Sequence, residues 1–565
     1  MPDRETMPSA PAPEVSERAA ALPQDALRIA SGYAFTGPAL HLGALLWDGQ
    51  CLPDAQIRVP LAMLNRHGLV AGATGTGKTK TLQLIAEQLS AQGVPVFLAD
   101  IKGDLSGIAA PGRADARVEG RAADVQQRWA ATGFPAEYYA LGGIGRGIPV
   151  RATVTGFGPV LLSKVLRLNR TQEQSLALIF HYADSKGLEL TDLKDLRAVV
   201  TFLTSDEGRS ELRTIGGLSA ATAGVILRSL TAFEAQGASG FFGEPEFNTG
   251  ELLRTAEDGR GVVSVLELSA VQDRPQLFST FLMWLLADLF HDLPELGDVD
   301  KPRLVFFLDE AHLLFDDASE AFLESITQTV RLIRSKGVGV FFVTQTPKDV
   351  PADVLAQLGN RVQHALRAFT PDDQKALNAT VKTFPKSPYD LEEVLTDLGT
   401  GEAVVTVLSE KGAPTPVAAT RLRAPESLMG PLGQDALERA VAESALYERY
   451  ARAVDRESAY ERLERGRGAK GPDEMREVAP RTPREPREPR EPRERREPRE
   501  RREPREPREP REPRERREEE RPSTVEQVVG SGVFRSLARS VGTQIGREIT
   551  RSLFGTARRS GRRRR

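Results

Sequence analysis

The sequence predicts an α/β protein built around a mainly parallel β-sheet, and two observations lead to that prediction. Short apolar runs of strand length alternate with segments of helical spacing, first in residues 67–71, 80–92 and 94–101. Strands that alternate with helices form parallel sheets covered on both faces, because parallel neighbours need long crossover connections. In addition, a glycine-rich turn at residues 72–77 follows the first strand, and sites in open α/β sheets lie at such strand ends.

The elements that follow continue this alternation, with one interruption. Residues 105–260 have mostly helical spacing, and we interpret them as a large, mostly helical insertion into the sheet. Residues 403–408 and 416–422 predict a hairpin near the end of the core. The strands predicted between the insertion and the hairpin are residues 261–268, 303–308, 338–344 and 361–368.

Both ends of the chain differ from this core in composition. The first 26 residues are rich in Pro, Ala, Glu and Ser, and residues 483–521 are built from Arg-Glu-Pro repeats. Segments with so few large apolar side chains cannot bury a core, so we expect both to be disordered. The predicted organisation is a disordered N-terminus (1–26), N-terminal strands with the first part of the core (27–104), the helical insertion (105–260), the second part of the core with its C-terminal hairpin and helix (261–465), a disordered linker (466–522) and a helical tail (523–565).

The tail, residues 523–565, combines an apolar repeat with a strong positive charge. Apolar residues recur every four positions from Val525 to Leu553, which predicts a basic amphipathic helix. Ten arginines and two glutamates give it a net charge of +8, so residues 1–522 carry −11 of the total of −3. A nucleic-acid-binding role would therefore need the tail or a locally basic channel. Docking of the tail on the protein's own body, or on a membrane, stays open as an alternative.

Cysteine content and apolar stretches predict where the protein acts. The single cysteine, Cys51, excludes an intramolecular disulfide and favours a reducing compartment. The N-terminus lacks the apolar core of a signal peptide. The most apolar stretch, Leu277 to Phe290, is shorter than the roughly 20 residues that span a bilayer. We therefore expect a cytoplasmic protein without a transmembrane segment.

The glycine-rich turn satisfies the phosphate-loop (Walker A) pattern G-x-x-x-x-G-K-[ST]. Its glycines let backbone N–H groups approach a β-phosphate, assisted by the N-terminus of the helix that follows. Lys78 offers its ammonium to the β- and γ-phosphates, and the Thr79 hydroxyl is a ligand for Mg²⁺. The predicted nucleotide-binding residues are Gly72, Ala73, Thr74, Gly75, Thr76, Gly77, Lys78 and Thr79.

A later strand supplies the acidic partners that this loop requires. The apolar run 304–308 ends in Asp309 and Glu310, as in a Walker B motif. We expect Asp309 to hold Mg²⁺, directly or through water, and Glu310 to act as the general base on the attacking water. The glutamate favours hydrolysis over a GTPase-like switch, and no Asn-Lys-x-Asp guanine-reading motif is present. The expected cofactors are ATP and Mg²⁺.

Three further side chains are site candidates. Gln345 ends the strand 338–344, which lies beside the Walker B strand in a RecA-like order, where Gln345 could sense the γ-phosphate or simply begin a loop. Arg334 belongs to a basic cluster, and such clusters usually form a solvated helix face. Arg334 could instead be an arginine finger that reaches a neighbouring subunit's γ-phosphate, with Arg361 as the rival candidate.

Six stretches of the sequence form a recognisable set: NRHG (65–68), ADIKGDLSG (99–107), GFFGEP (240–245), DEAHLLF (309–315), VRLIRSKG (330–337) and GNRVQHAL (359–366). Together they resemble the YjgR-type, helicase HerA-like ATPases of the wider HerA/FtsK group. The similarity covers roughly residues 60–465.

The resemblance implies residue roles, an assembly and partners. It implies a RecA-like P-loop NTPase core with the Walker residues acting as described, Gln345 as sensor and Arg334 as arginine finger. Members of the group are hexameric, ATP-driven DNA pumps, and HerA works with a nuclease in DNA end processing. A homo-hexameric ring, double-stranded DNA and a nuclease partner are therefore the expected assembly and partners.

Three functions remain open on the sequence alone. The first is a DNA-translocating ATPase, and the second is an ATPase with a protein client, which the acidic body fits. The third is a scaffold that binds nucleotide and barely hydrolyses it, and the intact Glu310 counts against that one.

Overall fold

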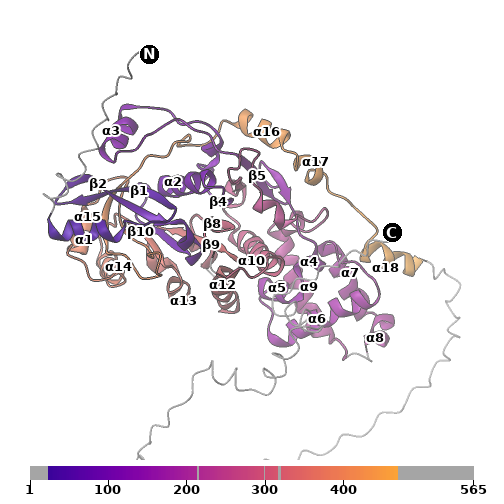
Figure 1. The fold of residues 1–565 in the computed structure, drawn as a ribbon. Coiled ribbons are helices and arrows are strands. Elements are labelled where there is room, and N and C mark those ends of the chain that lie inside the picture. Colours follow the sequence, from indigo (N-terminus) through magenta and orange to yellow (C-terminus); the bar gives the residue numbers. More distant parts are fainter. Residues whose placement is uncertain (1–22, 213–215, 298, 316–319, 469–565) are drawn as a thin grey trace, which may run out of the picture. The chain divides into compact units, whose positions relative to one another are not determined.

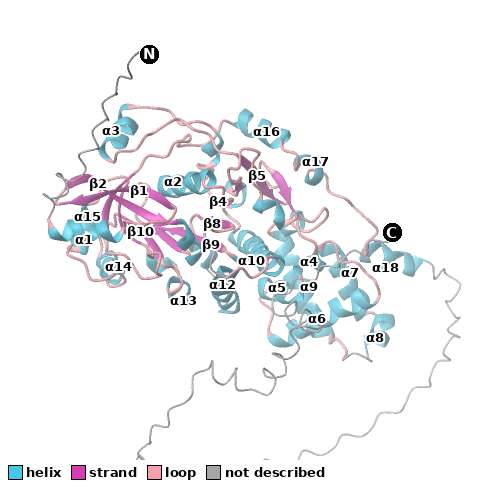
Figure 2. Ribbon diagram, viewed as in Figure 1, coloured by secondary structure: helices cyan, strands magenta, loops and turns pink. Residues whose placement is uncertain are grey.

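The computed structural model describes residues 23–212, 216–297, 299–315 and 320–468, and the strands of these residues form one twelve-stranded sheet (Figures 1 and 2). The predicted tail, and most of the predicted linker and N-terminal segment, lie outside the described residues. The strands are β1 (Ala39–Trp47), β2 (Gln50–Pro60), β3 (Gly68–Ala71), β4 (Val96–Asp100), β5 (Ala136–Leu141), β6 (Ile148–Val150), β7 (Val263–Glu267), β8 (Leu304–Leu308), β9 (Val338–Thr344), β10 (Asn360–His364), β11 (Glu402–Thr406) and β12 (Ala418–Leu422). Their order across the sheet is β2-β1-β12-β11-β10-β3-β9-β8-β4-β7-β5-β6.

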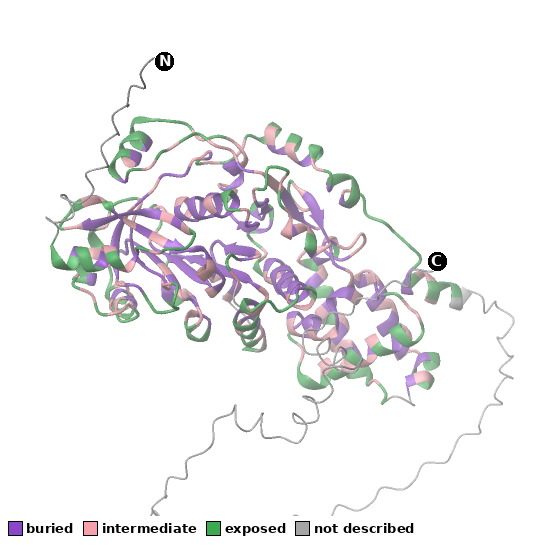
Figure 3. Cartoon of the chain, viewed as in Figure 1, coloured by how far each residue is buried: buried purple, intermediate pink, exposed green. Residues whose placement is uncertain are grey.

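All neighbouring strands from β10 to β6 are parallel, which confirms the mainly parallel sheet that the alternation predicts. The strands β3, β9, β8, β4 and β7 are buried along their whole length (Figure 3). A strand covered on both faces needs apolar side chains at every position, which explains the continuous apolar run of residues 304–308.

The other end of the sheet is antiparallel. The predicted hairpin is present as β11 and β12, and β12 pairs in turn with the N-terminal hairpin β1–β2. Gly43 of β1 lies opposite Leu422 of β12, and a Cβ on Gly43 would lie 2.0 Å from the Arg421 carbonyl oxygen. Glycine is therefore required where these two strands approach each other.

Helices cover both faces of the parallel strands (Figure 1). They are α1 (Gln24–Gly32), α2 (Lys78–Ala91), α3 (Ala116–Asp124), α4 (Val154–Phe157), α5 (Pro159–Val165), α6 (Arg170–Ser185), α7 (Leu193–Thr204), α8 (Asp206–Leu212), α9 (Ala220–Ala235), α10 (Pro275–Asp292), α11 (His312–Phe315), α12 (Glu320–Ile333), α13 (Ala352–Leu355), α14 (Pro371–Val381), α15 (Leu391–Asp397), α16 (Gln434–Glu443), α17 (Tyr447–Tyr450) and α18 (Ala459–Gly468). The connection through α2 crosses the sheet in one direction, whereas those through α10 and α12 cross it in the other. Right-handed crossovers then place α2 on one face and α10 and α12 on the opposite face.

The described structure differs from the expected segment limits in three places. Helix α1 begins at Gln24, inside the segment expected to be disordered, because Ala26 and Ile29 pack into the core. Helix α18 ends at Gly468, inside the expected linker. The insertion 105–260 contributes β5 and β6 to the sheet as well as helices, and strands of this length carry too little periodicity to be read from the sequence. Among the described residues, no helix is long and apolar enough to cross a membrane.

The chain after β12 lies along α2, the helix that follows the phosphate loop. The buried carboxylate of Glu87 accepts hydrogen bonds from the backbone N–H groups of Glu426 and Ser427, at 2.8 and 3.0 Å, and from the Ser427 hydroxyl. Gln83, one turn earlier, donates to the Ser427 hydroxyl at 2.6 Å and to the Leu428 carbonyl at 3.0 Å. The segment thereby fixes the outer face of α2.

Stability should depend on the protonation of Glu87. Burial raises the pKa of this carboxyl from 4.5 to about 7, because burial outweighs the hydrogen bonds that it accepts. The protonated carboxyl contributes on the order of a few kcal/mol to the free energy of unfolding. This contribution is fully present below pH 4.5 and is lost as the pH rises through about 7. In thermal unfolding, the Tm difference between the parent protein and Glu87→Gln should decrease as the pH is raised from 5 to 8. A difference that is constant over this range would contradict the prediction.

Candidate functional site: a phosphate loop and two carboxylates

The phosphate loop joins the carboxyl end of β3 to the first turn of α2. Gly72, Gly75 and Gly77 have φ values of +154°, +81° and +110°, a region that side-chain-bearing residues rarely adopt. A Cβ on Gly72 would also lie 2.4 Å from the Cβ of His364. The glycines of the motif are therefore required by the backbone path of the loop and, at Gly72, by contact with β10.

Neighbouring strand ends hold the loop from both sides. The Gly72 N–H donates to the Thr344 carbonyl at the end of β9 at 3.2 Å, and the Ala73 N–H donates to Ala365 just after β10 at 2.8 Å. On the other side, the Gly401 N–H donates to the Thr76 carbonyl at 2.9 Å. Because these contacts are backbone hydrogen bonds, the loop is preformed between β9, β10 and the turn before β11.

The two motif side chains that follow the glycines begin helix α2. The Lys78 ammonium donates to the carbonyls of Gly72 and Ala73 at 2.7 and 3.1 Å, so it lies inside the curve of the loop. Burial lowers the pKa of Lys78, although the nearby Glu310 opposes that shift. Thr79 is half-buried in the first turn. The predicted phosphate contact of Lys78 and magnesium contact of Thr79 stay predictions.

Asp309 follows β8, on the same edge of the sheet as the phosphate loop. Its side chain is 2% exposed, and its Oδ1 accepts the Glu310 N–H at 2.9 Å. Burial, reinforced by the charge of Glu310, raises the pKa of Asp309 to about 6. Among the described residues, the buried Asp309 Oδ2 has no hydrogen-bond partner.

Glu310 lies next to it in an unusual backbone conformation. Its φ is +46°, which is strained for a residue with a side chain and is typical of functional sites. One carboxylate oxygen forms a short ion pair with the Lys102 ammonium, and the other lies 3.3 Å from His312 Nδ1. The local backbone therefore presents the carboxylate toward the end of β4 and the phosphate loop.

Lys102 owes its position to Asp100, the last residue of β4. The buried Asp100 carboxylate accepts the N–H groups of Gly103, Asp104 and Leu105 at 2.8, 3.3 and 2.9 Å, which closes the turn that carries Lys102. Burial raises the pKa of Asp100 to about 7. Neither residue was assigned a role from the sequence. Their position at the carboxyl end of a buried strand of the parallel sheet was the signal that could have identified them.

The other candidate residues fall on opposite edges of the sheet. Gln345 directly follows β9, between β3 and β8, and its side chain is exposed at the edge that carries the phosphate loop. Arg334 and Arg361 lie instead near the amino ends of β9 and β10. Arg334 is exposed there, whereas Arg361 donates to the carbonyls of Leu358 and Thr383. The structure thus brings Gln345 to the Walker residues and separates both arginines from them within one chain.

A family comparison matches nearly the whole chain. The model described as "Helicase HerA-like C-terminal" matches residues 48–565. The chain belongs to this HerA-like family. Together with the phosphate loop and the carboxylates at its edge, this makes it a P-loop NTPase with a RecA-like core.

The curated relatives and solved structures that resemble this HerA-like chain share only low sequence identity with it. A probable helicase of Methanocaldococcus jannaschii is 31% identical over 153 residues, and the DNA double-strand break repair helicase HerA of Sulfurisphaera tokodaii is 26% identical over 163 residues. These matches span 25% and 28% of the chain, but only 28% and 32% of the relatives' own lengths. The unbound conjugative coupling protein TrwBΔN70 aligns with 72% of the chain and 95% of its own at 14% identity and a TM-score of 0.48. VirB4 of Thermoanaerobacter pseudethanolicus aligns with 69% of the chain and 97% of its own at 14% identity and a TM-score of 0.42.

The residues of this HerA-like site fit a magnesium nucleotide. The buried, unpartnered Asp309 Oδ2 is an oxygen atom of the kind that Mg²⁺ prefers. Among the described residues, no group of three His, Cys, Asp or Glu side chains could hold a metal without other ligands. A cation held by Thr79 and Asp309 would therefore depend on nucleotide oxygens and water, which is how Mg²⁺ is usually held at phosphate loops.

Two further residues at this site, Arg121 and His364, were not predicted from the sequence, because they come from segments far from the phosphate loop along the chain. Arg121 of α3 donates to the carbonyls of Thr400 and Gly401 at 2.8 and 3.0 Å and so supports the turn against the phosphate loop. His364 is fully buried, and its Nε2 lies 2.9 Å from the Thr81 hydroxyl. Burial, followed by the charge of Lys78, lowers the pKa of His364 to about 4, so the imidazole is neutral near pH 7. No local pattern marks either contact.

Proposed function

We propose that this chain is an ATP-hydrolysing ring motor of the HerA/FtsK type that translocates double-stranded DNA. The juxtaposition of the preformed phosphate loop with Asp309 and Glu310 on one edge of the sheet supports the hydrolytic part of this proposal. The single cysteine, Cys51, supports the cytoplasm as its place of action.

In this proposal, each side chain at the edge has a separate role. Lys78 binds the β- and γ-phosphates, and Thr79 and Asp309 hold the magnesium ion. When bound, the metal neutralises charge on the transferred phosphoryl group. Glu310 accepts the proton of the attacking water, and Gln345 senses the γ-phosphate from the strand between β3 and β8.

The position of Arg334 supports a ring. The amino and carboxyl edges of the sheet are on the order of 15–25 Å apart, at about 3.3 Å for each of the residues in β3 and β9. Arg334 therefore cannot reach the phosphate loop of its own chain, and a γ-phosphate that its exposed side chain contacted would belong to a neighbouring subunit. Arg361 is the weaker candidate, because its side chain is half-buried whereas Arg334 is exposed. A hexamer is the assembly that the family resemblance implies.

The client is proposed from the family and from the charge distribution. The two curated relatives, a probable helicase and a DNA double-strand break repair helicase, point to DNA, and a nuclease partner would accord with a role in break repair. The tail carries +8 and could supply phosphate contacts, whereas residues 1–522 carry −11. This acidic body favours the second candidate, an ATPase acting on a protein client without nucleic acid.

Turnover with and without double-stranded DNA tests the proposed client. We expect DNA to stimulate ATP hydrolysis at low salt and the stimulation to weaken as salt rises, because phosphate contacts release counterions. Deletion of residues 523–565 should leave basal hydrolysis intact, weaken DNA association and flatten its salt dependence. Turnover that DNA leaves unchanged would favour the protein client, and an unchanged salt slope after the deletion would exclude the tail as the DNA contact.

A further inference from the structure

A second lysine, Lys102, lies on the edge of the sheet that carries the phosphate loop. It comes two residues after Asp100, the end of β4, and β4 is the direct neighbour of the Walker B strand β8. Its ammonium forms the ion pair with Glu310 described above. Burial lowers the pKa of Lys102, but the hydrogen bond with Glu310 and the charge of Asp309 raise it above its ordinary value overall. Lys102 is therefore a charged group that both Walker B carboxylates stabilise.

The phosphate-loop lysine belongs to the same group of charges. Burial lowers the pKa of Lys78, the charge of Glu310 raises it, and the positive charge of Lys102 lowers it further. Such mutual influence requires the three groups to lie near one another. Two ammonium groups therefore approach Glu310, one from inside the phosphate loop and the other from the end of β4.

The ion pair does not enclose the side chain of Lys102. The exposed fraction of this side chain is 46%, whereas that of the Glu310 side chain is 8%. An ammonium group has three N–H donors, and a single carboxylate oxygen is the partner in this ion pair. The geometry therefore allows Lys102 to donate to a second acceptor that arrives from solvent while it stays beside Glu310.

The backbone fixes where this ammonium can act. The Asp100 carboxylate accepts the N–H groups of Gly103 and Leu105 at 2.8 and 2.9 Å, so the residues around Lys102 form a closed turn. Gly103 has a φ of +74°, and a Cβ there would lie 3.4 Å from Glu267 Oε1. Lys102 therefore projects from a turn that is anchored to the sheet, which is the kind of support that precise binding sites require.

The charges at this edge create a requirement that Lys102 meets. In the proposed function, Glu310 acts on the water beside the γ-phosphate, so two negatively charged groups must come close together. This repulsion is stronger in a partly buried site than in water. ADP has no γ-phosphate and avoids it. A cation that contacts Glu310 and the γ-phosphate at the same time offsets the repulsion for ATP.

We propose that Lys102 is a second γ-phosphate ligand, which donates to a γ-phosphate oxygen while it remains next to Glu310, and that it thereby makes the site prefer ATP over ADP. The inference rests on the proposed function, because it takes the phosphate loop as the nucleotide site. Lys78 contacts both nucleotides through the β-phosphate, whereas Lys102 distinguishes them. The contact lies within one chain, so it needs neither DNA nor a neighbouring subunit.

Equilibrium binding to the full chain tests this preference, with MgADP and the magnesium complex of a non-hydrolysable ATP analogue each competing against a fluorescent ADP. In Lys102→Gln, we expect the affinity for the ATP analogue to fall roughly tenfold or more, the scale of one charge-assisted hydrogen bond, and the affinity for ADP to stay within about twofold. Lys102→Arg keeps the charge and should retain most of the preference. A merely structural role would change both affinities together.

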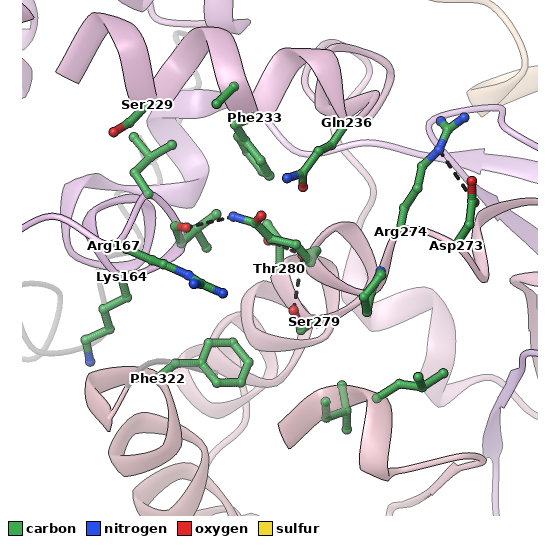
Figure 4. A pocket seen from close by; sticks show the side chains of 17 residues that line it. Lys164, Arg167, Ser229, Phe233, Gln236, Asp273, Arg274, Ser279, Thr280 and Phe322 are labelled. Atoms are coloured by element: carbon green, nitrogen blue, oxygen red, sulfur yellow. Dashed lines mark hydrogen bonds and ion pairs between the residues drawn. The ribbon is translucent and has the colours of Figure 1, made fainter. Parts of the chain in front are cut away.

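The matched control is Lys164→Gln, which changes a lysine in a separate cavity lined by residues of α5, α9, α10, α11 and α12 (Figure 4). Burial lowers the pKa of Lys164, and the charges of Glu173 and Glu324 oppose that shift, so this lysine also lies near carboxylates. The variant removes a cation of the same kind outside the phosphate loop and its carboxylates. It should leave both affinities unchanged.

A double variant separates a contact with the phosphate from simple neutralisation of Glu310. If Lys102 donates to the γ-phosphate, Lys102→Gln should weaken binding of the ATP analogue by a similar factor in a Glu310→Gln background. Loss of the effect in that background would overturn the proposal, as would equal losses of ATP-analogue and ADP affinity in Lys102→Gln. A parent chain that binds neither nucleotide would contradict the proposed function itself. A parent that hydrolyses ATP, with an unchanged preference in Lys102→Gln, would contradict this inference alone.

Discussion

Replacement of Glu310 by glutamine should lower ATP turnover roughly 10²-fold or more while ATP affinity stays within a few-fold, because the general base is lost and the groups of the phosphate loop remain. Glutamine has nearly the same shape and leaves the backbone hydrogen bonds that hold the phosphate loop intact. It cannot accept the proton of the attacking water, and it removes the ion pair with Lys102. Single-turnover hydrolysis and equilibrium binding of a fluorescent ATP analogue would measure the two effects separately.

Two variants serve as controls for this result. Lys78→Ala should weaken both binding and turnover, because its ammonium lies inside the phosphate loop. Glu267→Gln changes another buried carboxylate at a carboxyl strand end, but on β7, two strands away from β8, and should keep turnover within a few-fold. Equal loss of ATP binding in Glu310→Gln and Lys78→Ala would exclude the assignment of Glu310 as base.

Replacement of Arg334 by alanine should reduce turnover on the order of 10³-fold, the scale of a lost arginine finger, and the loss should be repaired between subunits. Mixing Arg334→Ala with Glu310→Gln chains creates interfaces in which one subunit supplies an intact Glu310 and its neighbour an intact Arg334. Turnover in the mixture should rise above the residual turnover of either variant alone. Activity per subunit of the parent should also rise with protein concentration as rings form.

Arg361 and Arg331 are the matched comparisons for this experiment. Arg361→Ala removes a guanidinium on the same edge of the sheet, and Arg331→Ala removes an exposed one from the helix that leads to Arg334. Neither should be rescued by Glu310→Gln chains. Rescue of Arg361→Ala, but not of Arg334→Ala, would identify Arg361 of β10 as the arginine finger. Turnover per subunit that does not depend on protein concentration would argue against any arginine finger between subunits.

The site residues that could be predicted from the sequence belong to short, contiguous motifs. The phosphate loop has its glycines, Lys78 and Thr79 in eight consecutive positions, and the apolar run 304–308 predicts a buried strand before Asp309 and Glu310. Strand-to-helix alternation predicted the parallel sheet for the same reason, because each unit is contiguous.

The rest of the site depends on pairings across long stretches of chain. Arg121 meets Gly401 only because α3 is folded back against the turn before β11, and His364 meets Thr81 because β10 is the neighbour of β3. The order of the strands in the sheet determines such contacts, and this order cannot be predicted from the periodicity of a single segment. The strands β5 and β6 escaped detection for a related reason, since β6 is only three residues long and joins the sheet through β5.

The strand order also dictates when the protein can become complete during its own synthesis. The phosphate-loop strand β3 has its two partners, β9 and β10, nearly 300 residues further along the chain, and β1 waits for Leu422 of β12. At about 5–20 residues per second, a ribosome makes these partners on the order of tens of seconds after the strands that need them. Until then the edges of β1 and β3 are open to incorrect pairing. The nucleotide-binding loop, although encoded early, is therefore among the last parts of the described chain to reach its working shape.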